Sequence, residues 1–342
     1  MTHAKLLVID ARAGLRHIAR EAFIDVLRPG DLVVANDAAT LPASLRGSQV
    51  RTGEPIEVRL AGRRSLSTEL ADFSAVVFGD GDFRTRTEDR PQPPSLVPGD
   101  ALVLGPLSAT VTGLLGHARL ISLHFDGSTD EIWSGLAHHG RPVQYAHVPT
   151  PLALWDVWTP IASPPVAFEP PSAGFALDWQ MIAALRGRNI GFATITHAAG
   201  ISSTGDAALD RRLPFDEPYE IPPSTAAAIA KARSDGGRII AIGTTVVRAL
   251  EHAAMRDGAV HAGRDIATER LGPGTRLRVV DAVLTGVHER GTSHYELLRA
   301  FADEATLSAA DDEIAAHGYR PHEFGDSVLV IPSECRIPPL CG

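Results

Sequence analysis

The chain has 342 residues, of which 44% are hydrophobic and 21% are charged, and its formal net charge is -9 at pH 7. Its length suits two domains, or one domain with an insertion, and its composition allows a substantial core. The acidic balance argues against a protein that coats nucleic acid nonspecifically, although a local basic groove is compatible with it. No apolar run reaches the roughly 20 residues of a membrane span, and the first ten residues lack the order of a signal peptide. We therefore expect a cytoplasmic protein without a membrane partner.

The two cysteines, Cys335 and Cys341, both lie in a Pro-rich tail. We expect free thiols there rather than a disulfide or a metal-binding pair. The sequence has no ligand spacing typical of zinc sites, no Walker loop and no Gly-x-Gly-x-x-Gly motif. We therefore expect no metal in the functional site, and the sequence does not indicate an oligomeric state.

The start of the chain has the pattern of an α/β domain. A short apolar run at residues 6–9 and a possible helix at 19–27 precede the turn Pro29-Gly30-Asp31, and a buried strand is expected at 32–35. Asn36 and Asp37 follow that strand at its carboxyl end, where open α/β sheets bind ligands. They either contact ligand hydroxyl groups or close an Asx turn on their own backbone.

Between residues 56 and 147 the pattern changes to short β-like segments separated by Gly, Pro and Asp. Many short strands with few helices predict a small antiparallel β-barrel inserted into the α/β domain. We expect the α/β domain to comprise residues 1–58 and 151–342, and the inserted β-barrel domain residues 59–150. The expected strands cover residues 56–60, 74–78, 101–104 and 118–125.

The return to the α/β domain lies in a Pro-rich segment, residues 149–171, that also contains Trp155, Trp158 and Phe168. These aromatic side chains either wall a cleft between the domains or seal the seam between them. A helix ending at Leu185 and a buried strand at 190–196 are expected next. The strand leads into residues 197–205, which are small and hydroxyl-rich after His197. Such a segment indicates backbone shaped around a ligand, or a surface loop.

The stretch from Gly236 to Ala254 is the most informative part of the chain. After an expected helix at 224–234, a Gly-Gly turn precedes a buried strand at 238–242, and apolar residues then recur at helical spacing. Gly243 allows a tight turn, and Thr244 or Thr245 can supply the N-cap oxygen. The unpaired N–H groups at such a helix start stabilise anionic or polar ligand atoms, with Arg248 one turn further on. Alternatively, the threonines only cap the helix and Arg248 only pairs with an acidic residue.

The last part of the chain repeats the strand-then-polar pattern. A strand is expected at 277–284, which would carry Asp281 and end at Thr285, with His288 three residues later. A helix at 294–302 and a final strand at 328–331 are expected after it. Tyr319-Arg320 and the group 324–327 precede this final strand.

Six groups of residues, in the same order along nearly the whole chain, make it resemble the S-adenosylmethionine:tRNA ribosyltransferase-isomerase family of queuosine biosynthesis. The groups are residues 29–37 with 41–43 and Gly47; 52–53 with 57–58; 171–174; 236–238 with 243–245, Arg248 and 250–251; Asp281 with Thr285 and His288; and 319–320 with 324–326. The resemblance implies an α/β domain interrupted by a β-barrel. It also implies an enzyme that consumes S-adenosylmethionine as a substrate. Such an enzyme moves the ribosyl part to an aminomethyl-deazaguanine base of tRNA, rearranges it to an epoxycyclopentane and releases adenine and methionine.

The chain also departs from the family pattern, so we expect a divergent member. Ala39 and Ser44 stand where the family has arginines, residues 174–178 lack its histidine, and residues 286–292 keep His288 but lose its lysine. Pro214-Phe215 replaces Met-His before the retained Glu217 and Tyr219. Lost cationic side chains could have contacted tRNA. Two alternatives therefore stay open: a relative that acts on a small-molecule acceptor, and a catalytically silent nucleoside- or RNA-binding protein.

The resemblance and the positions at strand ends together give a set of candidate site residues. The reaction needs a base beside the sulfonium, and His288 and His197 are the candidates for acid or base, since both follow strands. Asp281 and Asp326 are expected to orient groups by hydrogen bonds. The peptide backbone at the ends of several parallel strands is expected to converge on a single S-adenosylmethionine-shaped hollow, with Asn36, Thr244 and His288 pointing to it. The expected substrate-binding residues are Asn36, Asp37, Gly174, Glu217, Tyr219, Gly243, Thr244, Thr245, Arg248 and Thr285.

Overall fold

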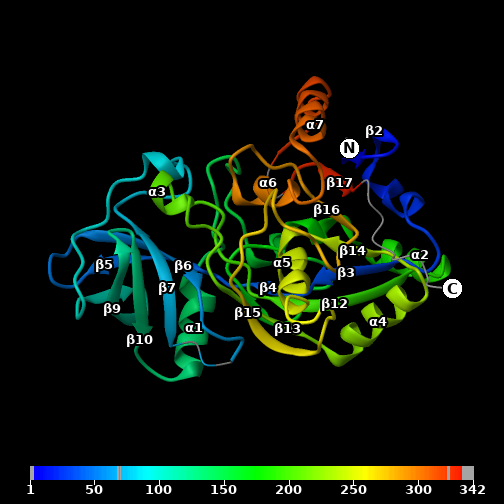
Figure 1. Cartoon of the computed structure of the whole chain (residues 1–342). Helices are drawn as coiled ribbons and strands as arrows, with labels where there is room; N and C mark the ends of the chain where they lie inside the picture. Colours follow the sequence, from blue (N-terminus) through cyan, green and yellow to red (C-terminus); the bar gives the residue numbers. More distant parts are fainter. Residues whose placement is uncertain (1–3, 68, 70, 322–323, 333–342) are drawn as a thin grey trace.

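The computed structural model describes residues 4–67, 69, 71–321 and 324–332. It consists of two lobes, a β-barrel and a larger α/β lobe built on a nine-stranded sheet (Figure 1). An α/β domain with an inserted antiparallel β-barrel is therefore confirmed. Among these residues, no helix is long and apolar enough to cross a membrane. Cys335 and Cys341, expected as free thiols, lie outside the described residues.

The nine-stranded sheet has the order β15-β13-β12-β3-β14-β16-β17-β1-β2. The central strands β12, β3, β14 and β16 are parallel to one another, so their carboxyl ends lie along one edge. The strands are β1 (Lys5–Asp10), β2 (Gly14–Ala19), β3 (Leu32–Asn36), β12 (Gly191–His197), β13 (Glu217–Ile221), β14 (Ile239–Ile242), β15 (Gly263–Ala267), β16 (Ala282–Gly286) and β17 (Ser327–Ile331).

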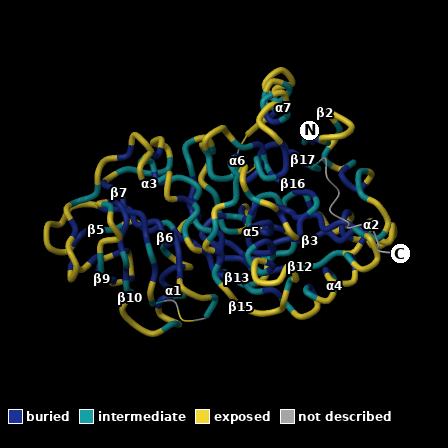
Figure 2. Tube along the Cα trace, viewed as in Figure 1, coloured by how far each residue is buried: buried dark blue, intermediate teal, exposed yellow. Residues whose placement is uncertain are grey.

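Helices cover both faces of this sheet, which explains why its central strands are nearly continuous apolar runs. In β3, Val34 packs into a core with α4 and α5, whereas Val33 and Ala35 pack into a second core with α2. The central strands accordingly lie in the buried interior of the lobe (Figure 2). The helices of this lobe are α2 (Trp179–Gly187), α4 (Pro223–Ser234), α5 (Thr244–Ala253), α6 (Ser293–Leu298) and α7 (Glu304–Ala316), with 3-10 turns η1 (Arg20–Val26), η3 (Leu154–Asp156) and η4 (Ser172–Ala176). The short helix α3 (Ala207–Asp210) lies against the barrel instead (Figure 1).

A buried ion pair sets β3 beside β14 at their amino ends. The guanidinium of Arg238 lies 2.6 Å from the carboxylate of Asp31, and both side chains are almost fully buried. The Asp31 carboxylate also accepts hydrogen bonds from the backbone N–H groups of Arg28 and Arg238. Asp31 of the first turn and Arg238 after the Gly-Gly turn therefore hold the starts of β3 and β14 together.

The inserted barrel closes in the order β10-β7-β6-β5-β8-β9. It closes tightly at Gly47, where an added Cβ would lie 1.8 Å from the carbonyl oxygen of Val103, so only glycine fits there. The chain enters the barrel after β4 (Ala39–Thr40) and returns at β11 (Pro165–Ala167), and these two strands pair in parallel. The barrel contains β5 (Ser44–Gln49), β6 (Pro55–Gly62), β7 (Asp72–Phe78), β8 (Ala101–Leu104), β9 (Leu107–His117) and β10 (Leu120–Phe125), with η2 (Thr87–Asp89) in a connection and α1 (Thr129–His139) after the last strand.

Several boundaries differ from the expectations. The barrel begins at Ser44, so the expected domain boundary after residue 58 falls inside β6. The helix expected at 19–27 is the 3-10 helix η1 over residues 20–26, because Ala19 still belongs to β2. The helix expected at 294–302 ends at Leu298. The strand expected at 277–284 begins only at Ala282. Residues 278–280 instead donate their backbone N–H groups to the buried carboxylate of Glu251.

Replacement of Asp31 by Ala should lower the free energy of unfolding by about 3–5 kcal/mol, because it leaves the Arg238 guanidinium buried without a counter-charge. The urea midpoint of the variant, followed by circular dichroism, measures this loss. Asp25→Ala is the control, since Asp25 pairs with Arg188 on the surface, and it should cost less than about 1 kcal/mol. Equal midpoints for the two variants would show that the buried pair does not hold the sheet.

Candidate active site

The candidate site is a pocket of about 80 Å³ at the carboxyl ends of β14 and β16, where α5 begins. It joins a larger cleft of about 700 Å³, and Glu169, Ser202 and His288 are among the residues that line both. Ligand sites usually have volumes of about 300–1,000 Å³. The pocket and cleft together therefore suit a nucleoside-sized ligand, with one end of it in the pocket. The predicted site residues in the pocket lining are Glu217, Gly243, Thr244, Thr245, Arg248, Thr285 and His288.

The start of helix α5 faces the pocket. Gly243 is the N-cap residue and has a φ of 94°, a backbone conformation that favours glycine. The expectation that Thr244 or Thr245 caps the helix is wrong, because both lie within its first turn and no side chain caps it. The threonines instead line the pocket beside the first backbone N–H groups of the helix. The partial positive charge of a helix N-terminus therefore lies at the pocket wall.

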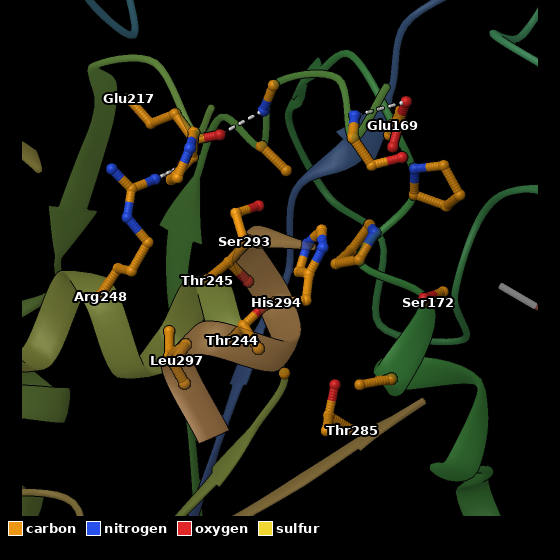
Figure 3. Close-up of a pocket in the computed structure, with 18 of the residues that line it drawn as sticks. Glu169, Ser172, Glu217, Thr244, Thr245, Arg248, Thr285, Ser293, His294 and Leu297 are labelled. Carbon is orange, nitrogen blue, oxygen red and sulfur yellow. Dashed lines mark hydrogen bonds and ion pairs between the residues drawn. The ribbon is translucent and has the colours of Figure 1, made fainter. Parts of the chain in front are cut away.

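One side of the pocket is built on a buried ion pair between Arg248 of α5 and Glu217 of β13 (Figure 3). The Arg248 guanidinium also donates to the carbonyl oxygens of Phe215 and Ala267, at 3.2 and 3.1 Å. The second oxygen of Glu217 accepts the N–H of Gly200 at 2.6 Å. Burial raises the pKa of Glu217, and the adjacent Arg248 opposes this rise. Arg248 thus pairs with an acidic residue, which was one of the two roles expected for it from the sequence.

His197 lies behind this pair and does not line the pocket. Its side chain is 0% exposed, and its Nε2 lies 3.5 Å from the Glu217 carboxylate. The Tyr219 ring stacks on the His197 ring with centroids 6.5 Å apart, and it is also buried. Burial, together with the nearby Arg248 cation, lowers the pKa of His197 well below the usual value. This enclosed imidazole is neutral, neither of its ring nitrogens has a hydrogen-bond partner among the described residues, and it has no access to a ligand in this conformation.

His288 lies at the junction of the pocket and the cleft. Its Nε2 is 2.7 Å from Oγ1 of Thr285, and its ring stacks on the His294 ring with centroids 4.7 Å apart. The hydrogen bond and the stacking fix the orientation of the imidazole. Histidine is the side chain whose ordinary pKa allows it to exchange protons near neutral pH. The geometry therefore makes His288 able to act as an acid or a base on a ligand in the pocket.

The opposite side of the pocket contains Glu169, which the sequence did not single out (Figure 3). The Tyr145 hydroxyl donates a hydrogen bond to Glu169, and the N–H of Ser202 donates another at 3.0 Å. Burial is the main cause that raises the pKa of Tyr145 well above its usual value, so the tyrosine stays a neutral donor. The pocket is thus bordered by carboxylates on both sides. The only local signal for Glu169 was its place directly before the Pro-Pro-Ser-Ala-Gly motif.

The loop after β12 provides a further wall. Ala199, Gly200, Ile201 and Ser202 line the pocket, as expected for a segment shaped around a ligand. The same loop is anchored in the other lobe, because Ile201 and Leu209 pack into the core of the barrel. Arg119 of the barrel region also donates a hydrogen bond to the Thr204 carbonyl oxygen. The pocket wall therefore belongs structurally to both lobes.

Comparison with known proteins identifies the family. The family model described as queuosine biosynthesis protein matches residues 1–330. The chain belongs to this family. It is 34% identical to the S-adenosylmethionine:tRNA ribosyltransferase-isomerase of Sorangium cellulosum, over 96% of this chain and 92% of that protein. The protein of the same name from Methylobacterium sp. is 33% identical, over 91% of this chain and 87% of that protein.

A solved structure supports the same architecture. The crystal structure of the S-adenosylmethionine tRNA ribosyltransferase from Thermotoga maritima superposes with a TM-score of 0.50. The alignment covers 96% of this chain and 93% of that chain, at 23% sequence identity. At this identity the similarity shows that the two chains share their fold.

Two of the residues that carry the family resemblance organise the end of β3 instead of lining the pocket. The Asn36 side chain donates to the carbonyl oxygen of His197 and accepts from the N–H groups of His197 and Ala38, so it closes the Asx turn that was one of its two expected roles. The Asp37 carboxylate accepts the hydroxyl groups of Thr194 and Thr196, at 2.9 and 2.7 Å. Burial raises the pKa of Asp37, although both hydroxyl groups oppose this rise.

Three further candidates also lie outside the pocket lining. Asp281 accepts the N–H of Ile239 at 2.8 Å, at the amino ends of β14 and β16 and thus at the opposite end of the strands from the pocket. Asp326 is buried and accepts the backbone N–H groups of Lys5 and Arg320, both at 2.8 Å. Gly174 lies in η4, where an added Cβ would come 2.9 Å from the Thr159 side chain. The expected convergence on one hollow therefore holds for Thr244 and His288 but not for Asn36.

Replacement of Arg248 by Met should destabilise the protein more at pH 8 than at pH 5. Without the guanidinium, the pKa of the buried Glu217 rises further, so ionisation of this carboxylate lowers the stability of the folded state. This penalty is absent below the pKa of the unfolded state, about 4.3, and grows as the pH rises toward the folded-state pKa. We expect a loss of about 3–5 kcal/mol at pH 8 and a smaller loss at pH 5, measured by urea unfolding at both pH values.

The matched control is Arg264→Met, whose partner Glu220 is exposed. It should cost less than about 1 kcal/mol and show little pH dependence. A pH-independent loss in the Arg248 variant would contradict the raised pKa of Glu217.

Proposed function

We propose that this chain transfers the ribosyl moiety of S-adenosylmethionine to the aminomethyl-deazaguanine base of a tRNA, isomerises it and releases adenine and methionine. The family assignment over residues 1–330 and the relatives' names support the reaction class. The observation that carries the proposal for this chain is the composition of the pocket: a helix start, carboxylates on two sides and a fixed histidine, opening into a cleft. We also propose that the protein works in the cytosol, on S-adenosylmethionine as a consumed substrate.

The pocket suits the charges of S-adenosylmethionine. Its methionine part carries a carboxylate, which the N-terminus of α5 at Thr244 and Thr245 would stabilise. Its ammonium and sulfonium groups are cationic, and a carboxylate nearby stabilises such charges. We assign Glu169 to the cationic part of the ligand, because it lines both the pocket and the cleft and so borders a ligand that spans them.

We assign the proton transfer to His288. The reaction requires removal of a proton from carbon next to the sulfonium, and the positive sulfur acidifies that carbon. A base of ordinary strength is sufficient once it is correctly placed. Thr285 holds Nε2 of the His288 ring, which leaves the orientation of the ring defined before the ligand binds. Glu217, Arg248 and His197 are assigned to shaping the pocket and Thr285 to orienting the base.

The cleft is the place that we assign to the tRNA base. Arg86, Arg211 and Arg290 are among its lining residues, together with the acidic Glu88, Asp210 and Glu289, so side chains of both charges border it. Arg86 pairs with Glu88, and Arg290 pairs with Asp311. Guanidinium groups at this border can meet phosphate groups of a nucleic acid, while an unstacked base enters the pocket. The names of the relatives, rather than the charge of the cleft, favour a tRNA acceptor over a small molecule.

Radiolabelled S-adenosylmethionine should release adenine only when tRNA that contains the aminomethyl-deazaguanine base is present. Adenine is measured by chromatography after incubation with this tRNA, with the same tRNA lacking the modified base, with tRNA-free cell extract, or with S-adenosylmethionine alone. Release with the tRNA-free extract would identify a small-molecule acceptor. Tight binding without release under every condition would identify a silent binding protein, and both results contradict the proposal.

Replacement of His288 by Ala should lower kcat by about 10²- to 10⁴-fold, the usual contribution of an acid–base group. The dissociation constant for S-adenosylmethionine, measured by calorimetry, should change much less. His138→Ala is the control, because the exposed His138 is not part of the pocket lining and its Nδ1 bonds to Ser134 of the same helix, α1. Unchanged turnover in the His288 variant would remove this residue from the mechanism.

A further inference from the structure

A second cluster of chemically active side chains lies away from the pocket and the cleft, between strand β2 and the end of helix α7 (Figure 1). Nε2 of His17 is 3.0 Å from a carboxylate oxygen of Glu313, and Nδ1 of His317 is 3.1 Å from the same oxygen. The two imidazole rings lie with centroids 4.0 Å apart. Within the described ranges, this is the one group of three such residues whose ligand atoms all lie within 4.8 Å of one another.

We propose that His17, Glu313 and His317 bind a divalent transition metal ion of the zinc type. Two imidazole nitrogens and one carboxylate oxygen form a donor set that suits zinc, cobalt and nickel. In a tetrahedral zinc site, bond lengths of about 2.0–2.1 Å place neighbouring ligand atoms roughly 3.3 Å apart. The observed separations of 3.0 and 3.1 Å are close to this value, but Nδ1 of His317 also lies 3.0 Å from the backbone carbonyl oxygen of Glu313, so the imidazole rings must turn to admit the ion. All three side chains are partly exposed, so water completes the coordination.

The groups behind the ligands support this role. The other ring nitrogen of His17, Nδ1, lies 2.9 Å from the hydroxyl of Tyr319, which is itself buried. Such a partner fixes the ring and directs its free nitrogen toward the metal, as is usual for metal-binding histidines. Lys5 donates hydrogen bonds to the carbonyl oxygens of His317 and Gly318, at 2.6 and 3.0 Å, so the backbone at the second histidine is held as well.

The metal would connect parts of the chain that are far apart in sequence. His17 belongs to β2, the outer strand of the sheet, and Glu313 lies 296 positions later on α7. An ion held by both elements stabilises the folded state, because the unfolded chain does not bring the three ligands together. The competing explanation is a set of hydrogen bonds and ion pairs between the histidines and Glu313, which needs no metal.

Titration of the tag-free protein with Co²⁺ and Zn²⁺, against a chromogenic chelator, tests the proposal. We expect one ion per chain, and at least a tenfold weaker affinity in His17→Ala and in His317→Ala. Tyr319→Phe should weaken binding by about tenfold, the usual effect of losing a supporting hydrogen bond. Zinc should raise the melting temperature of the unaltered protein by a few degrees and leave that of His17→Ala unchanged.

The matched control is His261→Ala, because His261 is exposed and pairs with a single carboxylate, Asp257. It should retain the affinity of the unaltered protein. The proposal is overturned if the unaltered protein competes no better than His17→Ala for the ion, or if His261→Ala loses as much affinity as His17→Ala. Either result assigns the cluster to hydrogen bonds and ion pairs alone.

Discussion

The buried pair between Arg248 and Glu217 is the interaction on which the pocket depends. One guanidinium bonds to Glu217 on β13, to the carbonyl oxygen of Phe215 just before that strand and to that of Ala267 at the end of β15, while the carboxylate it neutralises holds Gly200. Arginine suits this position because its planar group presents five donors with fixed directions, which lysine cannot do. The start of α5, the edge strands and the loop after β12 are therefore held in one arrangement before any ligand arrives.

The sequence predicted elements whose formation is decided by neighbouring residues. The apolar run before Gly243, followed by helical spacing, was sufficient for a strand, a tight turn and a helix. It could not predict elements that exist only through distant partners. Strand β15 contains few apolar residues and is ordered by pairing with β13. Residues 278–280 have the composition of a strand, but Glu251 from another element binds their N–H groups.

The same distinction applies to the site. Polar residues directly after β14 and β16 reach the pocket, because those strand ends and the helix start lie together there. Asn36 and Asp37 also follow a central strand, yet hydrogen bonds from β12 occupy their side chains, and no pattern within their own segment could reveal this. The place of Glu169 in the pocket wall could not be predicted, since Tyr145 and Ser202, which hold its carboxylate, are distant in the sequence.

Residues 199–202 form a wall of the pocket, and the chain then continues into a segment whose apolar side chains pack in the core of the barrel. Any macromolecule that tilts the barrel on docking thus displaces the surface that a small ligand touches. Thermodynamic reciprocity then applies: whatever factor the first occupant imposes on the affinity for the second, the second imposes on the first. An architecture of this kind makes the strength of the coupling between two occupants a property of the scaffold, whichever of them binds first.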